Sequence, residues 1–376
     1  MNKLAILVAF SIFIGIHSYL FIRMNQALPP VGPVRILFSV LFIISALSFP
    51  LGMLLGSKLP LWSVTVLENI GAWWMIGLLY LIVAVLFADL LRLANHFFHF
   101  YPGWVIQHYP QVKLGYFLFV LIFFAGLALA GNYRFRNPDV RELTLEIPKG
   151  SPADKGLTVV AATDLHLGAI IRKNRLSKFV NLINEQKPDL ILLGGDLIDH
   201  SMRPVIAQRM DEELKNLRST YGVYGVFGNH EYYGNAVEAA AFYKQSGITL
   251  LNDSAVIVAD RIVVAGRNDI SQRNRKPLDQ IVSGLPVHLP RILLDHNPAK
   301  LGDAQRNGID LQISGHTHNG QVFPINLLVR KIYQLAYGYL KMGDTHYYVS
   351  SGLGLWAAPA RIGTRSEIVK IRLDIR

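Results

Sequence analysis

The sequence predicts a protein of two parts: a bundle of four membrane-spanning helices, followed by a water-soluble α/β domain in which a layered sheet is flanked by helices. The first observation is an uneven distribution of charge. Residues 1–133 contain six Lys or Arg and only Glu68 and Asp89 as acids, whereas the rest of the 376-residue chain carries 31 basic and 24 acidic residues. The second observation is that short apolar runs alternate with polar helical stretches in the later part, which is typical of βαβ units.

Four apolar stretches without charged residues predict the membrane helices, and they cover about 4–22, 36–57, 69–88 and 115–131 of the transmembrane domain 1–133. Each is close to the roughly 20 residues that a helix needs to cross the hydrocarbon core. The first stretch could instead be a cleaved signal peptide, but no small-residue cleavage site follows it, so we expect a retained helix. The expected location is therefore the cell inner membrane, with a multi-pass topology and the lipid bilayer as a partner.

Basic residues beside the spans favour a cytoplasmic catalytic domain. Four spans place both termini on one side of the membrane, and the basic residues that flank this side are Lys3, Lys58, Arg134, Arg136 and Arg141. Those that flank the other side are Arg23, Arg35, Arg92 and Lys113. Because positive charge is retained on the cytoplasmic side, this excess of one charge indicates the orientation.

The net charge of +11 is spread along the chain, without a block of Lys and Arg. Nucleic acid is therefore not an expected partner, whereas anionic lipid headgroups or phosphate-bearing substrates are. The chain has no cysteine, which excludes disulfides and thiolate metal sites. The sequence indicates no oligomeric state.

The soluble domain is expected over 155–376, after a linker at 134–154 that is punctuated by proline and glycine. Buried strands are expected at Gly156–Thr163, Pro188–Gly194 and Tyr221–Phe227, with helices between them at Arg175–Gln186 and Met210–Arg218. Further strands are expected at 247–251, 254–258, 261–266, 290–294, 309–314, 346–351 and 367–373.

Five polar motifs follow one another along the soluble domain. They are Asp164-Leu165-His166, Gly195-Asp196-Leu197-Ile198-Asp199, Gly228-Asn229-His230-Glu231, His296-Asn297-Pro298 and Gly315-His316-Thr317-His318. Mn, Fe and Zn all accept mixed imidazole and carboxylate ligands. No packing requirement asks for this collection, so the sequence predicts a pair of closely spaced metal ions.

Individual positions suit that chemistry. Asp164 and His166 are two residues apart at the end of a strand, so a turn there can aim both at one ion. Asp196 follows two glycines, whose missing side chains would let a metal approach the backbone, and its two carboxylate oxygens can bridge two ions.

Asn229 supplies a neutral oxygen in a tight turn, and His316 and His318 can diverge so that each serves a different ion. The lone His296 is the remaining candidate ligand.

This series of motifs resembles the calcineurin-like metallophosphoesterase superfamily, whose pattern is Asp-x-His, Gly-Asp-x-x-Asp, Gly-Asn-His-Asp/Glu, a lone His and Gly-His-x-His. The resemblance covers about 155–376. The His-Asn-Pro setting of His296, and the tail from Gly320-Gln321 to Gly354, resemble the bacterial membrane-associated YkuE/YaeI-type branch, which the Chlamydia-type UDP-diacylglucosamine hydrolase also resembles. Where such relatives often have glycine after the last histidine, this chain has Asn319.

The resemblance implies a four-layer α/β/β/α sandwich and two divalent metal ions, Mn, Fe or Zn, with Mn favoured. It implies that one ion is held by Asp164, His166, Asp196 and His318, and the other by Asp196, Asn229, His296 and His316. It further implies that His230 is a catalytic residue rather than a ligand, and that Asp199 orients it.

The implied activity is that of a metal-dependent phosphoric ester hydrolase. Two ions roughly 3.5–4 Å apart bind a phosphoryl oxygen and activate a hydroxide that attacks phosphorus, while a protonated His230 assists the leaving oxygen. With four spans in front of it, the domain is expected to act on a lipid or lipid-linked phosphate ester. One alternative is a tethered phosphodiesterase or nucleotidase for soluble substrates.

An alternative of another class is a membrane sensor or transporter with a regulatory phosphoesterase domain. The scarcity of ionisable residues in the spans argues against transport, because transporters need functional polar groups inside the bundle.

The segment 322–340 is unusually apolar for a stretch next to the motifs, with Arg330, Lys331 and Lys341 interleaved or adjacent. It could be an ordinary core element. It could also be a membrane-facing lip with basic residues at headgroup level.

Overall fold

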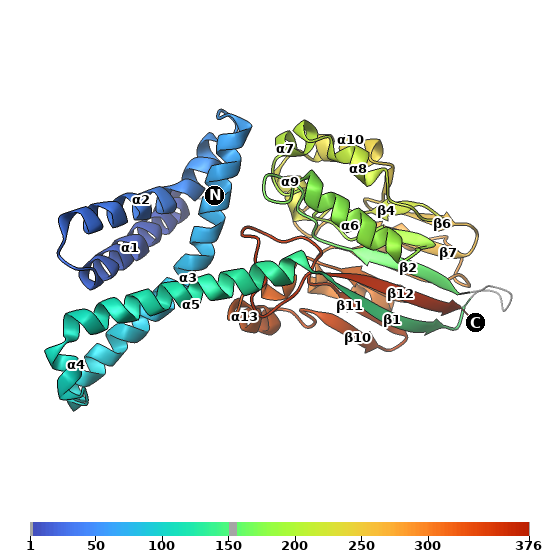
Figure 1. Ribbon diagram of the computed structural model, residues 1–376. Helices are drawn as coiled ribbons and strands as arrows, with labels where there is room; N and C mark the ends of the chain where they lie inside the picture. The colour runs from blue at the N-terminus through green and yellow to red at the C-terminus, as the bar shows by residue number, and fades with distance from the viewer. Residues whose placement is uncertain (1–2, 150–155, 376) are drawn as a thin grey trace. The chain divides into compact units, whose positions relative to one another are not determined.

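The structure, a computed structural model, describes residues 3–149 and 156–375. The chain divides into two compact units, Met1–Leu129 and Ala130–Arg376 (Figure 1). The boundary between them lies four residues before the end of the predicted transmembrane domain at 133. We describe each unit by itself.

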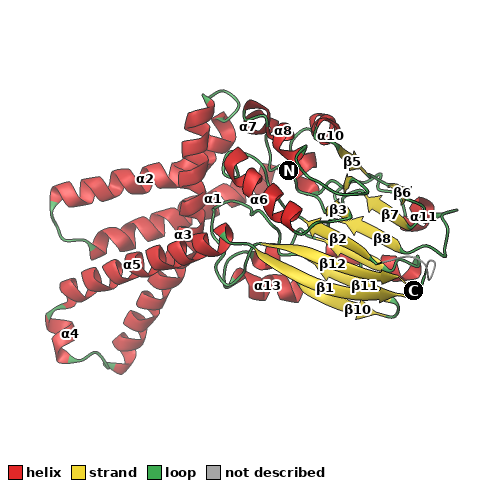
Figure 2. Cartoon of the chain, turned by 45° about the vertical axis from the view of Figure 1, so that its right-hand side comes forward, coloured by secondary structure: helices red, strands yellow, loops and turns green. Residues whose placement is uncertain are grey.

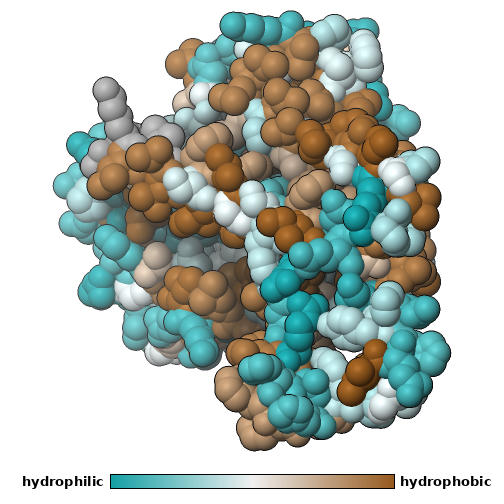
Figure 3. Space-filling model, turned by 90° about the vertical axis from the view of Figure 1, so that its left-hand side faces the viewer, coloured by the Kyte–Doolittle hydropathy of each residue, from teal (hydrophilic) through white to brown (hydrophobic). Residues whose placement is uncertain are grey.

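The first unit consists of helices. They are α1 (Lys3–Ala27), α2 (Gly32–Leu55), α3 (Leu61–Phe98), the short α4 (Gly103–Gln107) and α5 (Tyr109–Arg136), whose last turns belong to the second unit. All but α4 are long and apolar enough to cross a membrane. Apolar side chains are widely exposed at the molecular surface (Figure 3), and a small core around Leu20, Phe42 and Leu81 joins the helices. Such exposure is the pattern expected of side chains that face lipid rather than water.

Each predicted span is shorter than the helix that covers it, and the predicted 36–57 ends two residues after α2. The largest difference is at α3, where the predicted 69–88 extends to 38 residues, about 57 Å of helix at 1.5 Å per residue. An apolar run ends where the hydrocarbon ends, but a helix can continue through polar residues. In α3 it continues past Asp89 and Arg92, which form an ion pair at 3.2 Å.

The second unit contains two six-stranded sheets, seen as yellow arrows in Figure 2. The first sheet has the order β1 (Asp139–Ile147), β12 (Glu367–Ile375), β2 (Leu157–Ala162), β3 (Leu190–Leu193), β4 (Val223–Gly225) and β5 (Ile248–Leu250). The second has the order β10 (Gly338–Met342), β11 (Thr345–Val349), β9 (Leu311–Ser314), β8 (Arg291–Asp295), β7 (Ile262–Arg267) and β6 (Ser254–Val258). Strands β2 to β5 are mutually parallel, as are β7, β8, β9 and β11.

Side chains that alternate along each strand point to opposite faces, and this period builds two separate cores on each sheet. In β2, Val159 packs into the core between the sheets, whereas Val160 packs under the helices outside. In β8, Ile292 faces the core between the sheets and Leu293 faces the outer helices. The predicted α/β/β/α sandwich is confirmed.

The outer helices are short. Those over the first sheet include α6 (Lys173–Glu185), α7 (Met202–Ala207), α8 (Met210–Leu214), α9 (Asn229–Tyr233) and α10 (Ala236–Gln245). Those of the second half are α11 (Leu278–Val282), η1 (Pro298–Lys300), α12 (Gly302–Arg306), η2 (His318–Gly320) and α13 (Ile325–Ile332). The helix predicted at 210–218 ends at Leu214.

The predicted linker at 134–154 is wrong for most of its length. Helix α5 continues to Arg136, and strand β1 then pairs with β12 from Asp139 to Ile147. Leu143, Leu145 and Ile147 alternate with polar residues, which is the period-2 signal of a half-buried strand, but the flanking prolines hid it. The part at 150–154 lies outside the described residues.

The last turns of α5 are built into the second unit. The amide of Arg361 donates to the carbonyl of Gly131 at 2.9 Å, and Asn132 donates to the carbonyl of Pro359 at 2.7 Å. Phe135 is buried in the core under the outer helices, where Arg175 stacks on its ring at 4.4 Å. The soluble domain therefore starts inside a helix.

Candidate metal centre

Each of the five motifs begins where a parallel strand ends. Asp164 and His166 follow β2, Asp196 follows β3, and Asn229 follows β4 of the first sheet. In the second sheet, His296 follows β8, and β9 leads to the pair at 316 and 318. Because the carboxyl ends of parallel strands meet at one edge of a sheet, the two sheets bring these side chains into one cluster.

Most of the residues in this cluster have a strained backbone conformation. Five of the seven predicted ligands have a left-handed backbone with positive φ: Asp164 (55°), His166 (49°), Asp196 (51°), His316 (69°) and His318 (48°). Such a conformation costs about 1–3 kcal/mol for a residue other than glycine. It persists only where the surrounding fold imposes it, and it concentrates at functional sites.

One group of ligand atoms comes from the first and last motifs. Nε2 of His166 lies 3.1 Å from Nε2 of His318, which lies 3.5 Å from Oδ1 of Asp164. A second group contains Asp196, His296 and His316. Here Nε2 of His296 lies 3.1 Å from Oδ2 of Asp196.

Asn229 joins the second group through His316, whose Nδ1 lies 2.8 Å from the amide oxygen Oδ1. Asp196 faces both groups, because the same Oδ2 lies 3.8 Å from Nε2 of His166. The structure thus brings together all seven predicted ligand side chains.

Hydrogen bonds at the far side of the rings determine which nitrogen faces the cluster. Nδ1 of His296 lies 2.8 Å from the carbonyl oxygen of Gly194, so it donates a proton there and leaves Nε2 as a free acceptor. Nδ1 of His166 lies at the ion-pair distance of 3.4 Å from the carboxylate of Asp199, and the Nε2 of this ring likewise faces the cluster. This arrangement, with an outer acceptor orienting each ring, is common among metal-binding histidines.

The distances between the clustered side chains, and their unpaired buried atoms, fit bound divalent metal ions. Ligands held about 2 Å from one ion lie about 3 Å from each other, which matches the 3.1 and 3.5 Å separations around His318. Among the described residues, the buried atoms Oδ2 of Asp164 and Nε2 of His296 have no hydrogen-bond partner. Buried acceptors are rarely left in this state without a reason, and a bound cation supplies one.

Two glycines make room for the cluster. A methyl group on Gly228 would lie 2.2 Å from Oδ1 of Asp196, and one on Gly195, whose φ is +93°, would lie 2.7 Å from Nδ1 of His296. Gly195 therefore accommodates a ligand ring. The prediction was that the glycines before Asp196 let a metal reach the backbone. At Gly195 the space is instead filled by the ring of His296.

Asp199 and His230 form a third group with His166. Nδ1 of His230 lies 2.9 Å from the carbonyl oxygen and 3.1 Å from Oδ1 of Asp199, so it donates to this residue. The same Oδ1 is 2.9 Å from Nδ1 of the exposed His200. The predicted contact between Asp199 and His230 is present, and His200 joins the same carboxylate.

Electrostatics in this group favour a charged His230. Burial acts to lower its pKa, but the hydrogen bond to Asp199 and the charge of Asp196 outweigh burial and raise the pKa to about 9. Burial likewise acts to raise the pKa of Asp199, and the hydrogen bonds from His166, His200 and His230 hold it well below its usual range.

Glu231 is a structural residue of the site that the sequence argument left without a role. Its carboxylate accepts backbone N–H bonds from Asp196 (3.2 Å), Ile198 (3.0 Å) and Gly228 (2.7 Å), and so joins the second and third motifs. Burial, and then the charge of Asp196, raise the pKa of Glu231 to about 7. Its place directly after His230 in the third motif was the available signal.

Arg361 is a second residue that the sequence argument missed. It is fully buried, and its guanidinium donates to the carbonyls of His318 (3.1 Å), Gly352 (3.0 Å) and Gly354 (2.5 Å). It therefore holds the last metal motif against the loop that follows β11. No local sequence pattern marks it, because its partners are backbone carbonyls.

Asn319 takes the place of the glycine that is frequent in related sequences. Its φ is +49°, in the left-handed region. Asparagine tolerates this region better than most residues, so the departure leaves the turn intact.

The segment 322–340 contains helix α13, which follows the last metal motif. Ile325, Leu327, Leu328 and Ile332 of this helix are 39, 51, 59 and 65% exposed, so the core interpretation is wrong for α13. At its end, the ring of Tyr333 lies 6.1 Å from that of His316. Phe323 and Trp356, 49 and 52% exposed, extend the apolar area. We call these six apolar residues of 323–332 and 356 the α13 surface.

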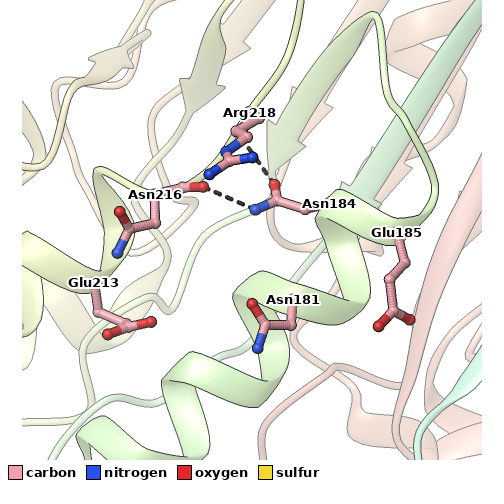
Figure 4. A pocket seen from close by; sticks show the side chains of 6 residues that line it. All are labelled: Asn181, Asn184, Glu185, Glu213, Asn216 and Arg218. Atoms are coloured by element: carbon pink, nitrogen blue, oxygen red, sulfur yellow. Dashed lines mark hydrogen bonds between the residues drawn. The ribbon is translucent and has the colours of Figure 1, made fainter.

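A polar hollow of about 450 Å³ lies elsewhere, between α6 and the chain after α8 (Figure 4). Asn184 bridges it, donating to the carbonyl of Asn216 at 2.8 Å and accepting from the amide of Arg218 at 2.9 Å. None of the residues that line it belongs to the five motifs. It has the character of a solvated surface rather than of a site.

A two-sheet domain whose strand ends gather histidine, aspartate and asparagine ligands defines a metal-dependent hydrolase. A family model described as calcineurin-like phosphoesterase matches residues 157–320. A Helicobacter pylori protein described as an uncharacterized metallophosphoesterase is 33% identical over 268 residues, which cover 70% of this chain and 70% of that protein. The chain belongs to the calcineurin-like metallophosphoesterase family, whose members are metal-dependent phosphoester hydrolases.

Two further relatives differ in how much surrounds the shared domain. A transmembrane protein with metallophosphoesterase domain from Danio rerio is 33% identical over 270 residues, covering 67% of this chain and 61% of that protein. The uncharacterized metallophosphoesterase YkuE of Bacillus subtilis is 30% identical over 264 residues, covering 66% of this chain and 92% of that protein. In this chain, helices α1, α2, α3 and α5 are long and apolar enough to cross a membrane.

Proposed function

We propose that this enzyme hydrolyses a phosphate ester of a lipid or lipid-linked substrate at the surface of the cell inner membrane. Family membership supports the phosphoester chemistry. The observation that carries the lipid part is the α13 surface, an exposed apolar area that directly follows the last metal motif in the chain.

We assign the seven clustered side chains to two divalent ions. Asp164, His166, Asp196 and His318 would hold one, and Asp196, Asn229, His296 and His316 the other. Asp196 is the shared ligand in this proposal, supported by the position of its Oδ2 between His166 and His296. Mixed imidazole and carboxylate ligands suit Mn, Fe and Zn, and we favour Mn.

His230 is proposed to act on the substrate rather than on a metal. When bound, a pair of divalent ions supplies Lewis acidity toward phosphoryl oxygens and lowers the pKa of the attacking water. A His230 with a pKa raised to about 9 carries a proton at neutral pH, so it can stabilise the phosphate or protonate the departing oxygen. Asp199 accepts from its Nδ1, which leaves Nε2 as the atom that meets substrate.

The α13 surface suits the interface of a bilayer. Apolar side chains on one face with Arg330 and Lys331 at the end of the helix are typical of segments that lie in the headgroup region. Residues next to the α13 surface also connect to the end of α5. Phe323 donates its amide to the carbonyl of Ile362, and the neighbouring Arg361 donates its amide to the carbonyl of Gly131. Because α5 is long and apolar enough to cross the membrane, this contact keeps the surface near a helix end.

The direct test compares substrates presented in two forms. With Mn added, the purified full-length enzyme is expected to hydrolyse phosphatidic acid in mixed micelles at a higher kcat/KM than soluble nucleotides. Equal or better hydrolysis of nucleotides would favour a tethered enzyme for soluble substrates instead.

A variant pair separates membrane contact from chemistry. Leu328→Ser with Ile332→Ser should reduce hydrolysis of lipid in vesicles while leaving hydrolysis of a soluble phosphodiester reporter unchanged. Val287→Ser, which alters an equally exposed apolar residue outside the α13 surface (72% exposed), is the matched control. Parallel loss on both substrates would indicate damage to the fold and count against the proposed contact.

We place the catalytic domain on the cytoplasmic side, on the excess of one basic residue beside the spans. The chain has no cysteine, so single cysteines can report the topology. A cysteine introduced at the exposed Val287 should resist a membrane-impermeant maleimide in intact cells and react after lysis. Labelling in intact cells would reverse the orientation.

A further inference from the structure

A second polar cluster lies in the first unit, among otherwise apolar helices. Asp89 of α3 is bracketed by two arginines: Nε of Arg23 in α1 lies 2.8 Å from Oδ2, and Nη1 of Arg92 lies 3.2 Å from Oδ1. Tyr19 also donates its hydroxyl to Asp89 at 2.7 Å. These charged residues lie just beyond the apolar stretches of their helices, at the level where basic side chains meet anionic lipid headgroups.

A third cation joins the cluster from α5. Nζ of Lys113 donates to the carbonyl of Gln26 at 2.9 Å and lies 5.4 Å from the centre of the Tyr109 ring. Arg92 in turn donates to the hydroxyl of Tyr109 at 2.8 Å. Lys113, Arg23 and Arg92 line one pocket with Asp89. Among its described residues, three cations therefore face one carboxylate, which leaves an excess of two positive charges.

Apart from Gln26 and Tyr116, the other residues that line the pocket are apolar. Its volume is about 70 Å³, and α3 and α5 contribute the wall, formed by Leu81, Ala84, Val85, Ala88, Phe117 and Val120. A hydrated inorganic anion gains nothing from such a wall, whereas a hydrocarbon chain does.

The depth of the charges matches the headgroup region. Arg23 lies four residues before the end of α1, and Lys113 lies four residues after the start of α5, about 6 Å along each helix. From Lys113 to Val120 the wall continues for seven residues, about 10 Å toward the hydrocarbon. Cations thus stand at the mouth and aliphatic side chains below them.

We propose that this pocket binds an anionic phospholipid, with its phosphate on Arg23, Arg92 and Lys113 and one acyl chain along the apolar wall. A purely structural ion-pair network would balance its charges, but here guanidinium and ammonium donors exceed the acceptors. Guanidinium groups hold phosphate by paired N–H bonds, and basic pockets between membrane helices bind anionic headgroups. The site is separate from the metal centre, and the lipid bound there need not be the substrate.

The first test measures lipid binding to the full-length protein in detergent by native mass spectrometry. The probes are dioleoyl phosphatidylglycerol, dioleoyl phosphatidylcholine and inorganic phosphate. The unmodified protein should bind phosphatidylglycerol preferentially. Arg92→Gln and Lys113→Gln should each weaken that binding about fivefold, since one basic residue near an anionic lipid contributes about 1 kcal/mol.

The matched control is Arg35→Gln. Arg35 is a basic residue predicted at the same membrane face, but it donates to the carbonyl of Leu28 and does not line the pocket. It should bind phosphatidylglycerol like the unmodified protein. Equal weakening by Arg35→Gln, or equal binding of the two lipids, would overturn the proposal in favour of general surface charge. Unchanged hydrolysis of the soluble reporter verifies that each variant is folded.

The second test fills part of the pocket with a larger side chain. Ala84→Leu adds volume inside the pocket, whereas Ala125→Leu adds it at an exposed position of α5 that does not line the pocket. Only Ala84→Leu should weaken phosphatidylglycerol binding. If Ala84→Leu has no effect and inorganic phosphate binds as tightly as the lipid, the site is one for a free anion, and the acyl-chain part of the proposal is wrong.

Discussion

The metal centre and the pocket in the helix bundle are both polar clusters, but the first is short of hydrogen-bond donors and the second is short of acceptors. The metal centre gathers lone pairs, from carboxylates, imidazoles and an amide oxygen, and the buried Oδ2 of Asp164 has no hydrogen-bond donor among the described residues. The bundle pocket gathers N–H donors around Asp89. A cluster rich in acceptors suits cations, and a cluster rich in donors suits anions.

The two clusters also differ in backbone conformation. Five metal-centre residues have positive φ, whereas Arg23, Asp89, Arg92 and Lys113 all lie within α-helices. Seven side chains from five loops can converge on one cluster only if the loops hold them in unusual conformations, which requires a rigid two-sheet scaffold. Long basic side chains reach a lipid headgroup from a regular helix, because their flexible stems do the positioning.

Asp196→Asn should have the largest effect. The amide replaces one carboxylate oxygen by an N–H group that repels a cation, and this residue faces both groups of ligands. We expect loss of metal from both positions and a fall in reporter hydrolysis of more than about 100-fold, beyond what losing a supporting contact costs. Metal content by plasma mass spectrometry and initial rates check this. Lipid binding in the bundle should not change, and normal metal content would contradict the shared-ligand assignment.

His230→Ala should come next. General acid catalysis contributes about 10²–10⁴-fold, so turnover of the reporter should fall within this range while metal content stays at the level of the unmodified protein. The two quantities are measured on the same preparation. Parallel loss of metal and activity would mean that His230 is a ligand.

Truncation tests where the catalytic unit begins. Residues 134–376 alone lack Gly131, so the buried amide of Arg361 loses its acceptor, whereas residues 130–376 keep it. A buried donor left without a partner costs about 1–3 kcal/mol. We expect the shorter chain to be less stable by this amount in urea denaturation. Equal stability of the two chains would mean that residues 130–133 act only as a linker.

Glu367→Gln tests a buried carboxylate outside the metal centre. Glu367 accepts from Tyr348, Ser350 and Ser351, yet burial, the largest effect, raises its pKa above the usual 4.5. The folded state then binds this proton more tightly than the unfolded state, so its contribution to stability is present below pH 4.5 and is lost as the pH rises through the folded pKa. The stability of the unmodified protein relative to Glu367→Gln should decrease across this window in thermal melts, and an increase would give the opposite sign for the shift.

The sequence predicted what depends on local pattern. Apolar runs located the four long helices, and shorter apolar runs located the buried strands that became β2 and β8. The motifs pointed to the seven side chains that the structure gathers into one cluster, because a ligand must be of a particular chemical type. Roles that depend on backbone partners are harder to predict, because every sequence supplies such partners. Nothing local marks Arg361, which bonds to carbonyls, and only the position of Glu231 after His230 pointed to its bonds with amides. Strand β1 was missed although its alternation is a local signal, because the prolines on either side of it marked the stretch as a linker.

The bond between Gly131 and Arg361 has a consequence for how the chain tolerates insertions. An added residue in a flexible linker changes only its length. An added residue between Gly131 and Arg136 would rotate one part of α5 against the other by about 100°, since a helix has 3.6 residues per turn. The carbonyl of Gly131 and the side chain of Phe135 could then not both meet their partners. The end of this membrane helix is therefore fixed in phase as well as in position.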